Sequence, residues 1–402
     1  MTVALASFLV IYLCISLYFF CTPVLGAIGK LFLYIFDKRL SLPTRWHVFT
    51  HVFSLVLYAP FALLLTPIDL FLSFLLGRFS PEGAPVFICG TPRSGSTLLH
   101  RLLIDSSSEF YGISHLEWRL PSVSIQLMLQ VTGIKAFLSR MDYWSGSSVS
   151  SQVSKMHSCN LGDYEEDAIL FEERCGYHPY QYLHVPVDAL NMVFGGSMPD
   201  STHKAASSID RRLLRFFRLY VRAIRILKLP SARLVSKEVA SNHRLGLVAR
   251  FFPSAKFVVI TRQPNEYLSS LYPLLDLSTQ AKTRSSRHLD DPSWWHDWYE
   301  WLVWQADNLR CFYLEYLPTG RILHVRYEDL VSSPRIQILR VMSFCGVTPT
   351  AQAYDMLERF ESTQPSRNRG YSYAPVSFDD NDFFRFSQVF YASGSDLPPL
   401  LK

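Results

Sequence analysis

The fold is constrained most by a short apolar run that leads through a glycine-containing loop into a helical segment. Residues 85–90 are PVFICG, and the loop GTPRSGSTLL at 90–99 continues into the helical TLLHRLLIDS. A buried strand that turns tightly into a helix is a unit of parallel sheets covered by helices. The turn also aims backbone N–H groups and the positive end of the helix dipole at one point. The segment therefore predicts an α/β domain with a phosphate site.

Further strands and helices follow in the same alternating order. KFVVITR at 256–262 is a second buried strand, and RILHVRYEDL at 321–330 contains a third. A helix with apolar periodicity, 210–227, lies among them, and 49% hydrophobic residues suffice for a packed core. The prediction is an α/β fold, a parallel sheet flanked by helices, over residues 81–402.

The N-terminal region predicts association with a membrane. Residues 1–29 carry no charged side chain and are long enough to cross a bilayer, so they predict a transmembrane anchor. A basic linker follows at 30–45, and a second apolar stretch at 46–77 contains Pro60, Pro67 and Asp69. This second stretch is expected to cross the bilayer, to re-enter it, or to lie in the interface between membrane and water. The expected localisation is a membrane, either an endomembrane or the plasma membrane.

The side of the membrane depends on that second stretch. The linker has Lys30, Lys38, Arg39 and Arg45 against Asp37, which places it in the cytoplasm. The domain is extracytoplasmic if 46–77 crosses and cytosolic if it does not. The chain has no N-glycosylation sequon, which leans toward the cytosol or toward an organism without this modification.

Composition excludes two classes of site. A net charge of +5 without a long Lys/Arg tract argues against nucleic acid as a partner. The seven cysteines form no CxxC pair, so no metal is expected.

The glycine-containing loop resembles a Walker A loop in spacing but not in its cation. Gly90 and Gly95 have the required separation, but Ser96 stands where the nucleotide hydrolases have lysine, and Arg93 lies inside the loop instead. A P-loop kinase or nucleotide hydrolase stays an alternative, as does a turn that only caps a helix.

PRSGSTLL resembles the phosphosulfate loop of the sulfotransferase family, and KFVVITRQPNEYLSSLY resembles the family's segment that binds a 3′-phosphate. The resemblance covers about residues 85–375 and implies 3′-phosphoadenosine 5′-phosphosulfate (PAPS) as the donor. It also implies a set of nucleotide-binding residues. These are Arg93, Ser94, Gly95, Ser96, Thr97, Arg262 and Ser270, with Arg367, Arg369 and Gly370 from the C-terminal SRNRGYSY, which is equally consistent with a solvated loop.

The catalytic base is predicted from the same resemblance. SKEVASNH places Lys237 where cytosolic members have the lysine of Lys-x-His, but Val239 replaces the histidine, so that base is absent. Lys237 and Arg93 are assigned to the bridging oxygen of the donor, and the alternative for Lys237 is an exposed lysine paired with Glu238. Other branches use a glutamate about two dozen residues after the loop, which makes Glu117 the preferred base, with a pKa raised by burial, and His115 the reserve. The alternative is a helix-end acid and a surface histidine.

The acceptor is the part of the reaction that the sequence predicts least clearly. The acidic GDYEEDA at 162–168 either orients an acceptor or is a solvated helix start, and a Trp-rich helix at 275–305 is more typical of core than of an acceptor pocket. The expected acceptor is a hydroxyl or amine of a small molecule, a lipid or a glycan. A non-catalytic membrane-bound protein of the same fold is a further alternative. Nothing in the sequence predicts the oligomeric state.

Overall fold

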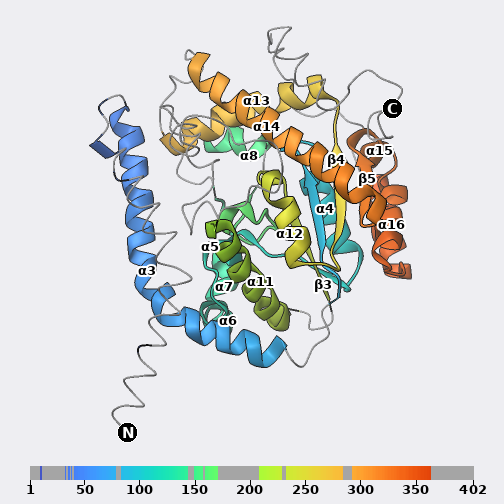
Figure 1. Cartoon of the computed structure of the whole chain (residues 1–402), viewed down its shortest axis with the longest axis horizontal. Helices are drawn as coiled ribbons and strands as arrows, with labels where there is room; N and C mark the ends of the chain where they lie inside the picture. The colour runs from blue at the N-terminus through green and yellow to red at the C-terminus, as the bar shows by residue number, and fades with distance from the viewer. Residues whose placement is uncertain are drawn as a thin grey trace.

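A five-stranded sheet with the strand order β2-β3-β1-β4-β5 forms the centre of the computed structural model of the chain (Figure 1). The four pairings that join these strands are parallel. The strands are β1 (Val86–Gly90), β2 (Phe110–Tyr111), β3 (Arg233–Glu238), β4 (Lys256–Thr261) and β5 (Ile322–Arg326). The structure describes residues 40–77, 83–143, 149–156, 159–170, 208–228, 232–283 and 292–363, and a few isolated residues before position 40.

The three strands expected from the sequence, β1, β4 and β5, are confirmed. β3 was missed because its sequence, RLVSKE, is half charged, although all but its first residue are buried. A polar strand in the middle of a sheet is exceptional unless its side chains are paired. Its charges therefore have partners at the site described below.

The side chains of β1 alternate between two hydrophobic cores, because successive residues of a strand point to opposite faces. Val86 and Ile88 belong to the core on the side of α4 (Ser96–Ser106) and α16 (Pro334–Cys345). Phe87 and Cys89 belong to the core on the side of α11 (Ser208–Lys228) and α12 (Leu245–Phe251). The sheet is thus a middle layer between two layers of helices, as expected for the α/β class.

The helices cover both faces and follow the strands in the alternating order of the sequence. They are α3 (Leu42–Gly77), α4 (Ser96–Ser106), α5 (His115–Arg119), α6 (Val123–Val131), α7 (Ile134–Leu138), α8 (Ser150–Met156), α11 (Ser208–Lys228), α12 (Leu245–Phe251), α13 (Pro264–Thr283), α14 (Pro292–Tyr316), α15 (Tyr327–Ser332), α16 (Pro334–Cys345) and α17 (Ala351–Thr363). Two 3-10 turns lie at Asn242–Arg244 and Leu317–Thr319.

The second apolar stretch of the sequence lies in one bent helix, α3, which contains Pro60 and Pro67 (Figure 1). One side of α3 joins the core through Val48, Val52 and Leu55. The predicted anchor at 1–29 lies almost wholly outside the described residues. None of the helices in the described part of the chain is long and apolar enough to span a bilayer, so the membrane helices expected at the N-terminus find no support in the structure.

Candidate functional site

The loop between β1 and α4 is closed by its own hydrogen bonds. The Ser94 backbone N–H donates to the Thr91 carbonyl oxygen over 3.2 Å, and the Ser94 hydroxyl donates to the same oxygen over 2.6 Å. Gly95 has a φ of 89°, and a Cβ at this position would lie 2.4 Å from the ring of Tyr327. Arg93 also has a positive φ, 67°, which costs a residue with a side chain about 1 kcal/mol or more. The surrounding structure therefore fixes this loop in a strained conformation that is typical of ligand-binding loops.

The start of α4 is suited to an anion. Within the described part of the chain, no side chain caps this helix, whose N-cap is Gly95. The first N–H groups of a helix have no partner within it, and they add to the positive end of the helix dipole. A phosphate or sulfate group at this point would accept hydrogen bonds from them.

A second basic group meets this loop from the neighbouring strand. Arg93 donates from Nε to the hydroxyl of Ser270, which is buried on α13, over 3.0 Å. Arg262, directly after β4, donates from Nη1 to the Arg93 carbonyl oxygen over 3.2 Å and lies 4.4 Å from the centre of the Tyr327 ring. Its Nη2 also pairs with Glu266 over 3.0 Å. The ends of β1 and β4, the loop and the start of α13 therefore converge on one place.

Lys237 of β3 lies beneath the first turn of α4. Its Nζ donates to Thr97 Oγ1 over 2.9 Å and to Glu165 Oε2 over 3.0 Å, and the side chain is buried. Burial alone would lower the pKa of Lys237, but the charges of Glu165 and Glu166 outweigh it and raise the pKa. A protonated ammonium thus lies beside the loop, and the alternative of an exposed Lys237 paired with Glu238 is wrong.

The acidic GDYEEDA segment is in part a buried structural element. Glu165 is buried against Lys237 and forms a longer pair with Arg101 at 3.6 Å. Asp167 is also buried and accepts a hydrogen bond from the Ser236 hydroxyl over 2.7 Å. Burial and the neighbouring Glu238 raise the pKa of Asp167 well above its usual range. The interpretation of a fully solvated helix start is therefore wrong for these two acids.

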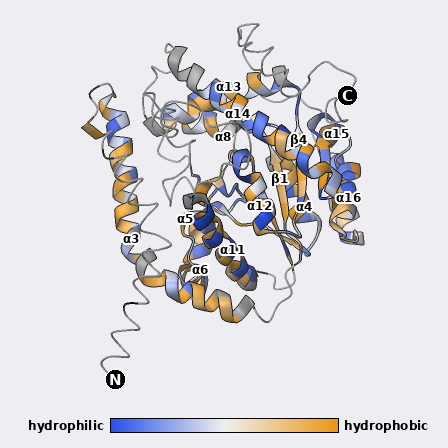
Figure 2. Cartoon of the chain, in the orientation of Figure 1, coloured by the Kyte–Doolittle hydropathy of each residue, from blue (hydrophilic) through white to orange (hydrophobic). Residues whose placement is uncertain are grey.

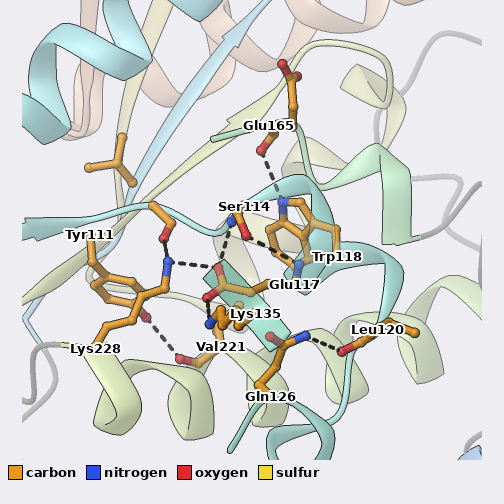
Figure 3. Close-up of polar contacts among 12 residues, drawn as sticks. Tyr111, Ser114, Glu117, Trp118, Leu120, Gln126, Lys135, Glu165, Val221 and Lys228 are labelled. Carbon is orange, nitrogen blue, oxygen red and sulfur yellow. Dashed lines mark hydrogen bonds and ion pairs between the residues drawn. The ribbon is translucent and has the colours of Figure 1, made fainter. Parts of the chain in front are cut away.

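Glu117 occupies a closed ionic cluster on α5 (Figure 3). Its carboxylate pairs with Lys135 Nζ at 2.9 Å and Lys228 Nζ at 2.8 Å, and it accepts the Ser114 backbone N–H over 2.7 Å. The Ser114 hydroxyl accepts the backbone N–H of Glu117, so the two residues form a reciprocal capping box at the start of α5. Only 1% of the Glu117 side chain is exposed.

The predicted rise of the Glu117 pKa is wrong in direction. Burial raises it, but the positive charges of Lys228 and Lys135 and the hydrogen bonds outweigh burial, so the pKa of Glu117 is lowered. Burial also lowers the pKa of Lys228 against the attraction of Glu117, which shows that the pair is held at a desolvation cost. A carboxylate with a lowered pKa and both oxygens occupied is a poor proton acceptor.

His115, the reserve base, is buried and lies two residues before Glu117 on α5. Its Nδ1 lies 3.1 Å from Cys159 Sγ, and its ring centre is 4.4 Å from that of Tyr143. The alternative of a surface histidine is wrong, since its exposed fraction is 3%.

The remaining predicted residues divide into two groups. Trp298, Trp301 and Trp304 of α14 are buried in the main core, which confirms the core interpretation of this helix for these three. Arg367, Arg369 and Gly370 lie outside the described residues, and their predicted contact with the nucleotide stays a prediction.

The profile of the sulfotransferase family matches residues 85–351, a range that contains all five strands of the sheet and the converging groups at their ends. The chain belongs to the sulfotransferase family. The family resemblance predicted from the two loops is thereby confirmed, and the enzyme class with it.

Two solved mycobacterial structures share the fold of this sulfotransferase. STF1 from Mycobacterium tuberculosis H37Rv is 16% identical in sequence and superposes with a TM-score of 0.59. The match covers 90% of this chain and 91% of the STF1 chain. STF9 from Mycobacterium avium is 13% identical in sequence with a TM-score of 0.60, and the match covers 88% of this chain and 86% of the STF9 chain. At this low identity the likeness shows the fold alone. No curated protein matches the sequence.

Two features beside the loop were not predicted from the sequence. These are the pairing of Glu165 with Lys237 and the buried carboxyl pair of Asp167 and Glu238. The run of acids in GDYEEDA was the signal for the first. The choice of which acids turn inward depends on the contact between this segment and β3, which the sequence does not display.

Proposed function

We propose that this sulfotransferase takes its sulfuryl group from PAPS and transfers it to a hydroxyl or amine. The observation that carries the proposal is the hydrogen bond from Arg93 to Ser270. It places the loop after β1 beside the helix after β4, at the carboxyl ends of adjacent strands, where open α/β sheets bind ligands. Arg93 and Arg262 meet where β1 and β4 end. Two basic groups in this arrangement suit one adenosine that carries anions at its 5′ and 3′ positions.

In this proposal the loop holds the phosphosulfate and the β4 end holds the 3′-phosphate. The N–H groups of Ser96 and Thr97 and the Arg93 side chain surround the 5′ group, while Arg262 and Ser270 bind the 3′-phosphate. Ser94 and Gly95 shape the loop.

The chemical step needs positive charge at the bridging oxygen. The acceptor atom bonds to sulfur, the bond from sulfur to that oxygen breaks, and the leaving nucleotide gains negative charge. Lys237 lies beside Thr97 at the loop, so its ammonium can stabilise this charge together with Arg93. The acceptor's proton passes to a base, for which Glu117 and His115 remain the predicted candidates, and the geometry of Glu117 weighs against it.

A binding experiment tests the donor. We expect Ser270→Ala to weaken binding of 3′-phosphoadenosine 5′-phosphate about tenfold or more, because a hydrogen bond to a charged group is lost. Binding of adenosine 5′-phosphate, which has no 3′-phosphate, should not change. Titration calorimetry of both ligands measures the difference.

Ser278→Ala is the matched control for this experiment. Ser278 lies on the same helix, is also buried, and its hydroxyl donates to the Leu275 carbonyl oxygen over 3.0 Å. A loss of affinity that is equal for both ligands, or equal in both variants, would contradict the assignment of Ser270. Preferential binding of ATP with magnesium would favour the nucleotide kinase or hydrolase alternative for the site.

Lys237→Met is expected to lower turnover by about 10²-fold through lost transition-state stabilisation. It also leaves Glu165 buried without its main counter-charge, which lowers stability. The double variant Lys237→Met/Glu165→Gln removes both charges and should recover stability but not turnover. Denaturant unfolding and a sulfuryl-transfer assay separate the two effects, and recovery of turnover in the double variant would remove Lys237 from the chemistry.

The acceptor is sought by labelling. Membranes that contain the protein are supplied with PAPS labelled in its sulfuryl group, beside membranes that contain Arg93→Ala. A labelled lipid or a labelled glycan that depends on Arg93 identifies the acceptor class.

A further inference from the structure

Most of α3 consists of hydrophobic residues (Figure 2), and its exposed residues are apolar over most of its length. Between His51 and Gly77, every described residue that is exposed is apolar. These residues are Phe53, Val56, Leu57, Pro60, Phe61, Leu64, Ile68, Phe71, Phe74 and Leu75. Soluble monomers seldom expose a continuous patch of this kind without a binding role.

Two polar residues of the same segment, Thr66 and Asp69, are buried against the protein. Thr66 is 3% exposed and Asp69 is 8% exposed. Asp69 Oδ1 accepts two hydrogen bonds from Ser124, one from the backbone N–H over 3.0 Å and one from the hydroxyl over 2.7 Å. A helix that lies against water shows the reverse pattern, with its polar side outward. Helices in contact with lipid have the arrangement seen here, in which the polar side faces the protein and the apolar side faces outward.

Two neighbouring helices extend the apolar surface. Ser124 lies in the first turn of α6, so the contact with Asp69 fixes α6 against α3. The exposed side chains of α6 and α7 include Leu127, Met128, Val131, Ile134 and Phe137. We name these residues and the ten exposed residues of α3 the apolar face.

The chain that leads into this face favours lipid over a protein partner. Residues 1–29, which carry no charge, come before α3, and the basic linker 30–45 runs into the first turn of this helix. Basic residues next to an apolar surface suit anionic lipid headgroups. A protein interface carries a polar rim and about one hydrogen bond per 100–200 Å², whereas the described exposed residues between Phe53 and Leu75 offer no side-chain donor or acceptor.

We propose that the apolar face is a membrane-docking surface, which lies along the bilayer with its side chains among the lipids. The opposite side of α3 stays packed on the domain through Val48, Val52 and Leu55. Docking in this manner is separate from any anchoring by residues 1–29 and does not depend on the proposed donor.

Photo-crosslinking to lipid tests the proposal on the full chain. The protein is reconstituted in vesicles of phosphatidylcholine and phosphatidylserine that include a phospholipid with a photoreactive acyl chain, and the labelled peptides are mapped by mass spectrometry. We expect label on peptides of α3 and of α6 and α7. Ile336 of α16, which is 63% exposed, is the internal control and should remain unlabelled.

A charge substitution gives the matched comparison. Phe61→Glu/Phe71→Glu places carboxylates on the apolar face at exposed positions and should lower labelling of α3 by about tenfold. Ile336→Glu should leave it unchanged. Label confined to residues 1–29, equal label at Ile336, or the absence of lipid label from α3 would each overturn the proposal.

Discussion

We expect Arg93→Ala to lower the turnover of sulfuryl transfer by about 10²-fold or more. The guanidinium of Arg93 links the loop to Ser270 and lies where the proposed donor carries most of its charge. Loss of a preorganised cation at a site where charge develops in the transition state costs about 3 kcal/mol of barrier, which corresponds to this factor. The measurement is release of 3′-phosphoadenosine 5′-phosphate under saturating donor.

Two further variants make the Arg93 result specific. Arg93→Lys keeps the charge but not the Nε donor to Ser270, so it should lose less turnover than alanine. Arg250→Ala removes an exposed arginine at the end of α12 and should have no effect. The fold should survive in Arg93→Ala, because alanine meets the same positive φ as arginine. Unchanged turnover in a folded Arg93→Ala protein would exclude this residue from the mechanism.

The second large effect is expected on stability. Glu117→Gln removes the charge that faces Lys228 and Lys135 and leaves two partly buried ammonium groups uncompensated. Breaking a buried ion pair by removing one partner costs about 3 kcal/mol or more of unfolding free energy. Urea unfolding followed by circular dichroism measures it.

An exposed ion pair supplies the control for Glu117. Glu109 is 51% exposed and lies 3.9 Å from Arg233, so Glu109→Gln should cost less than about 1 kcal/mol. A Glu117→Gln protein with unchanged stability but with turnover lowered by about 10²-fold would instead support Glu117 as the base.

The pH dependence of stability gives an independent check on the Glu117 carboxylate. Its pKa is lowered in the folded protein from an ordinary value of 4.5, so its ionised form stabilises the fold above that pH. This contribution is lost as the pH falls through the folded pKa. The difference in stability between the wild type and Glu117→Gln should therefore shrink in acid.

The site was predictable only where its residues form local patterns. The loop 90–99 is one continuous segment, and its strand, glycines and helix start are legible in the sequence, as are Arg262 and Ser270 after the next buried strand. The ionic partners of Glu117 come from α7 and α11, which are distant in the chain. Since the sign of a pKa shift in a buried group depends on such partners, burial alone gave the wrong direction for the pKa of Glu117.

Sequence alone determined the class of the fold, the position of the anion-binding loop and the family, because strand, turn and helix preferences and the loop's residue types act over a few neighbouring residues. Only the tertiary structure decided that Lys237 pairs with Glu165 instead of Glu238, that Arg93 meets Ser270, and that the polar side of α3 turns inward. These outcomes depend on which strands lie side by side and which helix faces are covered, and the energy of burying a charge or an apolar side chain is set by those distant contacts.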